Sequence, residues 1–354
     1  MYVADGTSFI RSQNVYDNRF SHAGLARITD QAADSLKNVT VRTGDVLVCI
    51  TGESVTRTCL VDDAVLPARV SQHVAIIRPS KAKLDSKFLM YALLNSPVKN
   101  RLNVLSSAGA TRRALTKSHL QGTIIALPPL DEQKRIAGVL GALDELIETN
   151  LSLLGNLTET CRAVFLSRWD GETRVPIGQV SQVVAGQSPP GNTYNEDGVG
   201  LPFHQGVRDF GDRYPTTRVY CDAPKRVAKQ GDLLLAVRAP VGLVNVSKEE
   251  TAIGRGLAAI RFDVPSRGYH ALTADRRLWD PYQGEGTVFA AVNKANISAA
   301  KIPWVEDDRL DDFLHILDAA HLEISREVDY LRRTRDELLP LLLSGKVSPG
   351  EIAA

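Results

Sequence analysis

The chain has 354 residues, of which 44% are hydrophobic and 23% are charged, and its formal net charge is +1. These values are those of an ordinary soluble globular protein with two or three domains. No apolar run reaches the roughly 18 residues that a membrane helix needs, and the N-terminus has no signal-peptide pattern, so we expect a cytoplasmic protein.

The small net charge hides an uneven distribution. Residues 1–130 carry 16 Lys and Arg against 9 Asp and Glu, and residues 171–304 carry 16 against 13. Residues 131–170 carry 4 against 7, and residues 305–354 carry 6 against 12. Two basic segments therefore alternate with two acidic ones, and basic surface on separate domains is typical of DNA-binding proteins. Uneven solvated charge without a polyanion partner is the alternative interpretation.

The first globular segment, residues 1–127, contains short strand patterns and one helix pattern. Alternating and β-branched residues predict the strands, and an apolar run that ends at Asn95-Ser96-Pro97 predicts the helix. The expected elements are strands over residues 39–50 around a turn at Thr43-Gly44-Asp45, a strand over 71–78, a helix over 87–94, a loop of small residues over 106–113 and a last strand over 120–127.

Residues 128–169 predict a long helix. Pro128 and Pro129 end whatever precedes it, and Asp131 is a suitable N-cap. About 38 residues without proline follow, which would make a helix of about 57 Å. Apolar residues recur at steps of three and four, which is the seam of a coiled coil and needs a partner helix. The seam consists of Leu140, Leu143, Ile147, Leu151, Leu154, Cys161 and Phe165.

The second globular segment, residues 170–304, repeats landmarks of the first with insertions and deletions between them. The matching landmarks are Gly6 with Gly200, Gly44-Asp45 with Gly231-Asp232, residues 73–78 with 256–261, 109–111 with 285–287, 115–117 with 292–294, and Leu127-Pro128 with Ile302-Pro303. One stretch has no counterpart, because only five residues precede Gly6 whereas about thirty precede Gly200 in the second segment. We therefore expect either that the start codon is placed late or that another chain completes the first domain.

Residues 305–345 predict the partner helix, followed by a tail over 346–354. A shift of 177 positions superimposes the two apolar seams and places Asp131 on Asp308, which indicates an internal duplication. Pro340 should kink the last turns. The partner seam contains Leu317, Ile324, Val328, Leu331 and Leu338. The expected fold is therefore α+β: two α/β domains alternating with two long helices that pair as an antiparallel coiled coil, with a pseudo-twofold internal repeat.

Several motifs resemble those of type I restriction–modification specificity subunits. They are Pro128-Pro-Leu-Asp-Glu-Gln-Lys-Arg-Ile136, Leu143-Asp-Glu-Leu-Ile-Glu-Thr-Asn150, Phe165-Leu-Ser-Arg-Trp169 and the alternation of two domains with two helices. The resemblance covers nearly the whole chain. It implies target-recognition domains over 1–127 and 170–304, and conserved helices over 128–169 and 305–345.

The same resemblance implies a function and partners. The chain would be a non-catalytic subunit that reads a bipartite double-stranded DNA target, one half-site per recognition domain. It would recruit two modification subunits, which bind S-adenosylmethionine and methylate adenine N6, and restriction subunits that cleave DNA. No cofactor would be bound by this chain itself.

Base edges in DNA are read by Arg, Asn, Gln and similar side chains: Arg pairs with guanine, and Asn or Gln with adenine. For any single residue, a solvated position or a phosphate contact is the alternative. The candidates are Arg11, Gln13, Asn14, Arg57, Arg112 and Arg113 in the first segment, and Gln187, Gln205, Arg208, Arg238 and Arg255 in the second.

The sequence gives no support for catalysis or for a metal site. The four cysteines have no paired zinc spacing, so we expect reduced, buried thiols. His315 and His321 are six residues apart and fall on different helix faces, and Asp144, Glu145 and Glu148 are expected on solvated faces. Two alternatives stay open: a DNA-bridging architectural protein without sequence specificity, and a modification enzyme with an unfamiliar site.

Overall fold

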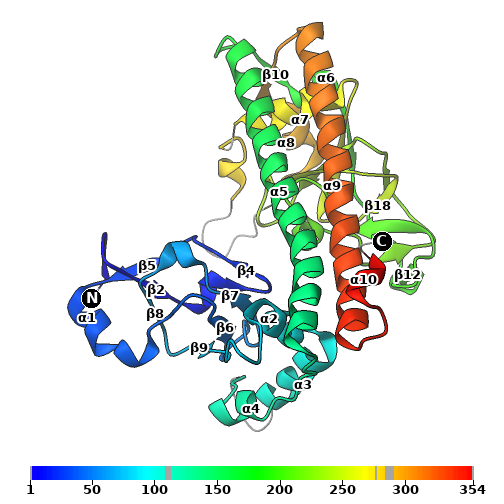
Figure 1. Cartoon of the computed structure of the whole chain (residues 1–354). Coiled ribbons are helices and arrows are strands. Elements are labelled where there is room, and N and C mark those ends of the chain that lie inside the picture. The colour runs from blue at the N-terminus through cyan, green and yellow to red at the C-terminus, as the bar shows by residue number, and fades with distance from the viewer. Residues whose placement is uncertain (1, 108–112, 276, 284–290, 353–354) are drawn as a thin grey trace. The chain divides into compact units, whose positions relative to one another are not determined.

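The computed structural model describes residues 2–107, 113–275, 277–283 and 291–352. Helices and sheets occur together throughout (Figure 1), which confirms the expected α+β class and the two long helices. Within the described residues no helix combines the length and the apolar character needed to cross a membrane.

The chain divides into two compact units. Unit 1 comprises residues 1–149 and 328–354, and unit 2 comprises residues 150–327. The two long helices, α5 (Leu130–Arg168) and α9 (Asp308–Leu343), each contribute residues to both units. Each unit is therefore described by itself below.

Unit 1 contains short strands in small sheets and several helices. Its strands are β1 (Tyr2–Val3), β2 (Thr7–Ile10), β3 (Val15–Tyr16), β4 (Arg19–Phe20), β5 (Ala26–Ile28), β6 (Val46–Cys49), β7 (Thr58–Leu60), β8 (Ala68–Val70) and β9 (Val74–Ile77). Its helices, besides its parts of α5 and α9, are α1 (Asp30–Ser35), α2 (Ser86–Leu94), α3 (Ser96–Ser107), α4 (Lys117–Gln121), α10 (Pro349–Ile352) and the 3-10 turns η1 (Ser12–Asn14), η2 (Lys37–Val39) and η3 (Asp63–Val65).

Unit 2 is built from the same kinds of elements. Its strands are β10 (Arg174–Pro176), β11 (Ser181–Ala185), β12 (Tyr194–Asn195), β13 (Leu201–His204), β14 (Tyr220–Cys221), β15 (Val227–Ala228), β16 (Leu233–Ala236), β17 (Val244–Val246), β18 (Thr251–Ile253), β19 (Leu257–Phe262) and β20 (Lys301–Pro303). Its helices are α6 (Ile177–Val180), α7 (Pro265–Ala274), α8 (Lys294–Ala299) and the 3-10 turns η4 (Gly191–Thr193), η5 (Val207–Asp209) and η6 (Asp280–Tyr282).

The sheets of the two units have matching strand orders and registers. The order β1-β5-β2-β8 in unit 1 parallels β12-β14-β13-β18 in unit 2, and β7-β6-β9 parallels β17-β16-β19. Val46 pairs with Ile77 in unit 1, and Leu233 pairs with Ile260 in unit 2, which are the positions that the sequence landmarks match. The repeated sequence landmarks therefore stand at equivalent places in the two sheets.

The hydrogen bonds of the Gly-Asp landmark show why it recurs in both units. Asp45 is buried, accepts a bond from the backbone N–H of Arg42 and binds the guanidinium of Arg78 through both oxygens. Asp232 does the same with Lys229 and Arg261 in unit 2. The preceding Gly44 and Gly231 have φ of 82° and 84°, a conformation that strains other residues. The Gly-Asp pair thus closes a turn and fixes the strand that carries the arginine.

The units differ where the sequence predicted a missing stretch. In unit 2, β10 pairs with β20 and β11 pairs with β19. In unit 1, β9 is an edge strand, and residues 122–129 form no strand. The prediction of a strand over 120–127 was therefore wrong: Thr116 caps α4 instead, and the residues after it pair with no strand among those described.

Other expected boundaries are close but not identical. The helix expected over 87–94 begins one residue earlier, where Asp85 caps the backbone N–H of Phe88. Strand structure over 39–50 is confined to β6, because a 3-10 turn precedes it. Helix α5 begins at Leu130, so Asp131 lies in its first turn and not at its N-cap, and α9 continues past Pro340 to Leu343.

Each unit has its own apolar core. In unit 1, α2 packs with the first turns of α5 and the end of α9 around Phe88, Leu140 and Leu342. In unit 2, β16 and β19 pack with α7 and with segments of α5 and α9 around Leu235, Phe165 and Leu314. The two long helices are thereby part of both cores. All four cysteines are buried and free, as expected.

Candidate nucleic-acid interface

A cavity of about 780 Å³ opens on unit 2 beside η5. Four of its lining residues are DNA-binding candidates from the sequence, and they come from three separate segments: Gln205 and Arg208, Arg238, and Arg255. The fifth candidate, Gln187, is exposed next to the lining residue Ser188, whose hydroxyl accepts a bond from the N–H of Arg255. The structure thus brings together side chains that are up to 50 positions apart in the sequence.

Close backbone packing forms one wall of this cavity. The turn between β18 and β19 carries Arg255 and runs against Gln205. A Cβ atom on Gly256 would lie only 2.1 Å from the carbonyl oxygen of Gln205, so no larger residue fits there. Glycine therefore allows this turn to hold Arg255 beside the loop of Gln205.

The cavity has more positive than negative groups. Its lining includes four arginines, among them Arg218, and two carboxylates, Asp209 and Glu196. Asp209 is buried; it accepts hydrogen bonds from the N–H of Gln205 and from the guanidinium of Arg218. The guanidinium groups of Arg208, Arg238 and Arg255 are exposed and pair with no carboxylate among the described residues. Three arginines are therefore free to bind an anion or a base edge.

A buried histidine lies directly behind this site. His204 precedes Gln205, is nearly inaccessible to solvent, and its Nδ1 has no hydrogen-bond partner among the described residues. Burial lowers the pKa of His204 to about 4, against an opposing effect of the Asp209 carboxylate. The imidazole is therefore neutral at pH 7 and adds no charge to the site.

The candidates in unit 1 do not gather in one cavity. Arg11 and Gln13 both donate to the carbonyl oxygen of Gly24. Asn14 is fully buried, and its side-chain amide donates to the carbonyls of Ser21 and Ala23. These bonds shape the loop after β2, so we assign Asn14 to the scaffold and not to DNA contact.

The remaining candidates of unit 1 lie around the β3–β4 hairpin and α3. The guanidinium of Arg57 lies 4.8 Å from the ring centroid of Tyr16, and that of Arg19 lies 5.2 Å from the same ring. Arg113 donates to the side-chain oxygen of Asn103 on α3, and Arg112 is outside the described residues. Arginine stacked on an aromatic ring keeps its charge exposed in a fixed orientation.

Four residues of these sites were not predicted from the sequence: Asp209, Arg218, Tyr16 and Arg19. Nothing in the local sequence distinguishes Arg218, because its partner Asp209 is nine positions away and joins it only in the folded loop. The hairpin pair could have been noticed, since an aromatic residue and an arginine three positions apart flank the turn residues Asp17 and Asn18. That pattern is common, so it would have been a weak signal.

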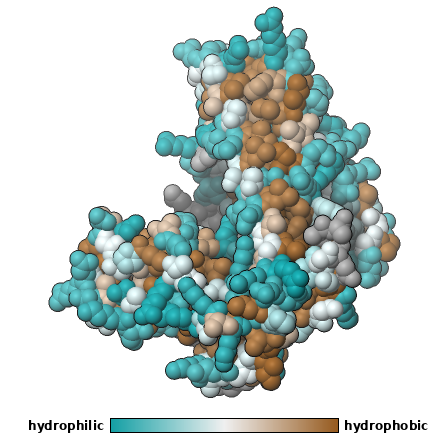
Figure 2. Space-filling view, in the orientation of Figure 1, coloured by the Kyte–Doolittle hydropathy of each residue, from teal (hydrophilic) through white to brown (hydrophobic). Residues whose placement is uncertain are grey.

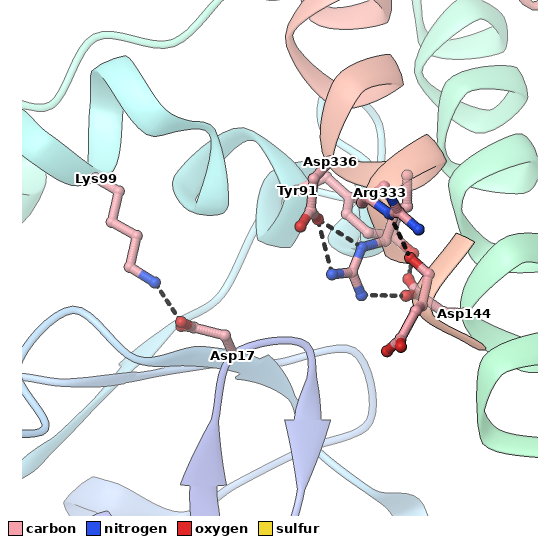
Figure 3. A network of polar contacts seen from close by, with 8 residues as sticks. Asp17, Tyr91, Lys99, Asp144, Arg333 and Asp336 are labelled. Atoms are coloured by element: carbon pink, nitrogen blue, oxygen red, sulfur yellow. Dashed lines mark hydrogen bonds and ion pairs between the residues drawn. The ribbon is translucent and has the colours of Figure 1, made fainter. Parts of the chain in front are cut away.

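The helix-pairing candidates are buried or half-buried without exception. Leu140, Ile147, Val328 and Leu331 are buried, and Leu143, Leu151, Leu154, Leu317, Ile324 and Leu338 are half-buried. Polar side chains connect the same helices within each unit: Arg335 donates to Asp144 in unit 1, and Thr158 bonds to His321 in unit 2. Figure 3 shows Asp144 of unit 1 among its polar contacts. Asp144 also accepts from the hydroxyl of Tyr91 on α2, so it is not the solvated carboxylate that the sequence suggested.

Unit 2 also contains a buried charged cluster. Asp318 on α9 binds the guanidinium of Arg213 and the ring of His270 on α7, and ligand atoms of Cys161, His270 and Asp318 lie within 4.8 Å of one another. Burial works against ionisation of Asp318, but the bonds from His270 and Arg213 outweigh it and lower its pKa. Because Arg213 already neutralises this carboxylate, we interpret the trio as part of the packing and not as a metal site. His315 is exposed and His321 buried, so they do not form a pair.

Comparisons with known proteins show what this chain is similar to. A family profile described as the type I restriction modification DNA specificity domain matches residues 4–157. A putative type I restriction enzyme specificity subunit of Methanocaldococcus jannaschii is 29% identical over 78% of this chain and 71% of its own length. The EcoBI specificity subunit of Escherichia coli is 25% identical over 46% of this chain and 35% of its own length.

A solved structure extends the likeness to the fold. The type I restriction–modification S subunit from M. genitalium has a TM-score of 0.57 and 17% sequence identity, over 96% of this chain and 90% of that one. At this identity the match concerns the fold alone. By sequence, residues 4–157 match the type I restriction modification DNA specificity domain, and over most of its length the chain is similar to a putative type I specificity subunit.

Proposed function

We propose that this chain reads the DNA target of a type I restriction–modification complex and positions the other subunits on it. The observation that carries the proposal is the cavity of unit 2, where Arg208, Arg238 and Arg255 have free guanidinium groups beside Gln205. Arginine reads guanine through two hydrogen bonds and glutamine reads adenine, so this set can distinguish bases as well as hold phosphates.

Each unit would read one half of a bipartite target. In unit 2 the reading groups are those of the cavity, together with Gln187. In unit 1 they are Arg57 and Arg19, stacked on Tyr16, with Arg11, Gln13, Arg112 and Arg113 as further candidates. We expect the recognition domains to be residues 1–127 and 170–304, because the same strands recur in both with different loops between them.

The two long helices would pair as an antiparallel coiled coil. This proposal is supported in unit 1 by the bond between Asp144 and Arg335, and in unit 2 by the bond between Thr158 and His321. As the position on α5 increases from 144 to 158, the partner position on α9 decreases from 335 to 321. The apolar seam of each helix would then be covered by the other.

Two modification subunits would dock on the acidic helices and the flanks of the recognition domains, and restriction subunits would join them. Figure 2 shows hydrophobic side chains along the visible face of the helices. The exposed apolar side chains of α5 and α9 include Leu153, Phe313 and Ile316. S-adenosylmethionine and the adenine-N6 methyl transfer would belong to the modification subunits, so this chain would bind no cofactor and catalyse no step. We expect the chain to act in the cytoplasm on double-stranded DNA.

The competing function is a DNA-bridging protein without sequence preference. The comparisons give it no support, since every named relative is a specificity subunit. A bridging protein would bind all sequences with equal affinity. A specificity subunit should instead prefer one target sequence, and only when its modification partners are bound.

The test is methylation profiling of the assembled complex over a DNA library randomised at both half-sites. Replacing Arg238 or Arg255 by Ala should relax the half-site read by unit 2 and leave the other half unchanged. A lost arginine–guanine contact costs about 1–3 kcal/mol, which is roughly 5- to 150-fold in discrimination. A phosphate contact would instead weaken binding to all sequences alike and reduce the salt dependence by about one ion.

Arg226→Ala is the matched control, because Arg226 is an exposed arginine of unit 2 that does not line the cavity. It should leave both half-sites intact. If Arg238→Ala and Arg255→Ala change both halves together, or if neither changes the methylated motif, the assignment of this cavity to base reading is wrong.

A further inference from the structure

An ion pair in the wall of the unit 2 cavity connects the ends of two paired strands. Gln205 directly follows β13, and Arg218 lies two residues before β14, which pairs antiparallel with β13. The Asp209 carboxylate accepts from the backbone N–H of Gln205 with one oxygen and from the guanidinium of Arg218 with the other. Asp209 therefore holds both of these cavity-lining residues.

The Asp209 carboxylate is itself fixed in position. The backbone N–H of Asp209 donates to the carbonyl of Gly206, and its carbonyl accepts from the N–H of Thr216. The Asp209 side chain is 9% exposed, whereas that of Arg218 is 40% exposed. A fixed carboxylate orients the guanidinium before any ligand arrives, so less rotamer entropy is lost on binding.

Arg218 retains donors that a ligand can use. A guanidinium carries five N–H donors, and among the described residues Arg218 donates to Asp209 alone. Because the side chain lines the cavity and is partly exposed, its other donors are available to a group that enters there. Arg261 differs, because it donates from two nitrogens to both oxygens of the buried Asp232.

Pairing with a carboxylate changes how an arginine can bind DNA. Phosphates attract the free positive charges of Arg208, Arg238 and Arg255 at any sequence. The charge of Arg218 is neutralised by Asp209, so the pair gains little from a phosphate. A guanine edge instead requires two donors in a defined orientation. The pair therefore fits base reading better than phosphate binding.

On the basis of the proposed function, we propose that Arg218 reads a guanine in the half-site bound by unit 2, and that Asp209 is the residue that positions it. Two donors of the guanidinium would face the O6 and N7 acceptors of guanine, while another stays with the carboxylate. Arg218 would thus be a reader whose orientation is set by the fold, unlike the three arginines of the cavity that have no carboxylate partner.

The first test is Arg218→Lys in the assembled complex with its modification subunits, profiled by methylation over the library randomised at both half-sites. Lysine keeps the charge and can still pair with Asp209, but it cannot present two donors in one plane. We expect discrimination to fall roughly 5- to 150-fold at one base pair of the unit 2 half-site. The other positions, and the salt dependence of DNA binding, should not change.

The second test is Asp209→Asn, which separates positioning from a structural role. The amide oxygen can still accept from the N–H of Gln205, but the charge that holds Arg218 is gone. The same base pair should be relaxed, while affinity for all sequences rises and the salt dependence increases by about one ion, because Arg218 becomes a free charge. A purely structural role would instead weaken binding to all sequences.

Asp275→Asn is the matched control, because it removes the same charge from an ion pair with Arg174 that does not line the cavity. It should leave the motif and the salt dependence unchanged. The proposal is overturned if Arg218→Lys leaves the motif intact or if Asp209→Asn weakens binding to every sequence; should Asp209→Asn not assemble, Arg218→Lys decides alone. If Arg238→Ala and Arg255→Ala relax the unit 2 half-site while Arg218→Lys does not, the proposed function stands and this inference is wrong. If none of these variants changes the motif, both are wrong.

Discussion

Units 1 and 2 form the same strands but place their arginines differently. Both keep the buried carboxylate after a left-handed glycine and the arginine that binds it, as in Asp45 with Arg78 and Asp232 with Arg261. In unit 2 three further arginines without a carboxylate partner among the described residues line one cavity: Arg208, Arg238 and Arg255. In unit 1, Arg19 and Arg57 stack on Tyr16. The repeated positions are thus those that hold the strands, and the differing ones are those that we propose as DNA contacts.

The polar contacts between α5 and α9 differ in the same way. Positions 144 and 335 of unit 1 correspond to 321 and 158 of unit 2 under the shift of 177. The first pair is an ion pair between Asp144 and Arg335, and the second is a neutral contact between His321 and Thr158. Unit 2 instead buries its charge nearby, in Arg213 and Asp318. The stability of unit 2 should therefore depend strongly on this deeply buried ion pair.

Breaking that ion pair should have the largest effect. In Arg213→Met, Asp318 loses the guanidinium and keeps only His270, which leaves a charge without its main partner; the cost should be about 3–5 kcal/mol. Arg213 is 5% exposed and also lies 4.0 Å from the ring centroid of Tyr269, so packing is lost as well. Hydrogen exchange in urea, followed separately in each unit, should show unit 2 opening first.

Arg335→Met is the comparison variant in unit 1. The Arg335 side chain is 24% exposed, so water can solvate Asp144 when the guanidinium is removed. A cost of about 1–2 kcal/mol is expected. If both variants destabilise their units equally, burial of the charge is not what distinguishes the two units.

The shared Gly-Asp turn gives the next largest effect. Asp45→Ala and Asp232→Ala each remove a buried carboxylate that accepts both from a backbone N–H and from an arginine. We expect about 3 kcal/mol for each, with unit 1 affected by the first and unit 2 by the second. Chemical denaturation of both variants measures the two costs. Unequal costs would mean that the repeated turn contributes differently to the free energy of unfolding of the two units.

Low pH should destabilise unit 2 more than unit 1. Burial lowers the pKa of His204 and of His321 to about 4, and both belong to unit 2. Because the unfolded chain takes up these protons near pH 6.5 and the folded unit does not, stability is complete above that pH and is lost as the pH falls towards 4. At pH 5 the loss is about 2 kcal/mol for each histidine.

The measurement is hydrogen exchange at pH 7 and pH 5, corrected for the intrinsic exchange rates. The histidines of unit 1, which are His22, His73 and His119, are exposed or half-buried, so unit 1 should lose less protection. Replacing His204 by Phe and His321 by Leu should remove most of the acid sensitivity of unit 2. An unchanged pH response in that double variant would contradict the assignment.

The sequence predicted the elements that depend on local patterns and missed those that depend on distant partners. The period of apolar residues identified α5 and α9, and the cap at Asp85 marks the start of α2 within one residue of its predicted position. The strand expected over 120–127 failed because alternation predicts a strand only where a neighbour can pair with it. Asn14 has the side chain of a base reader, but its loop folds around it. The pairing of Asp209 with Arg218 could not be predicted, because the two residues meet only in the folded loop.

The smallest expected effect compares Leu127 of unit 1 with Ile302 of unit 2, which match in the sequence repeat and differ in burial. Ile302→Ala should destabilise unit 2 by about 2–4 kcal/mol, because Ile302 is fully buried on β20, which pairs with β10. Leu127→Ala at the matching position should change the stability of unit 1 by less than about 0.5 kcal/mol, because most of that side chain is in water. Urea denaturation of both variants measures the two costs. A cost of Leu127→Ala that approaches the cost of Ile302→Ala would mean that unit 1 covers this side chain.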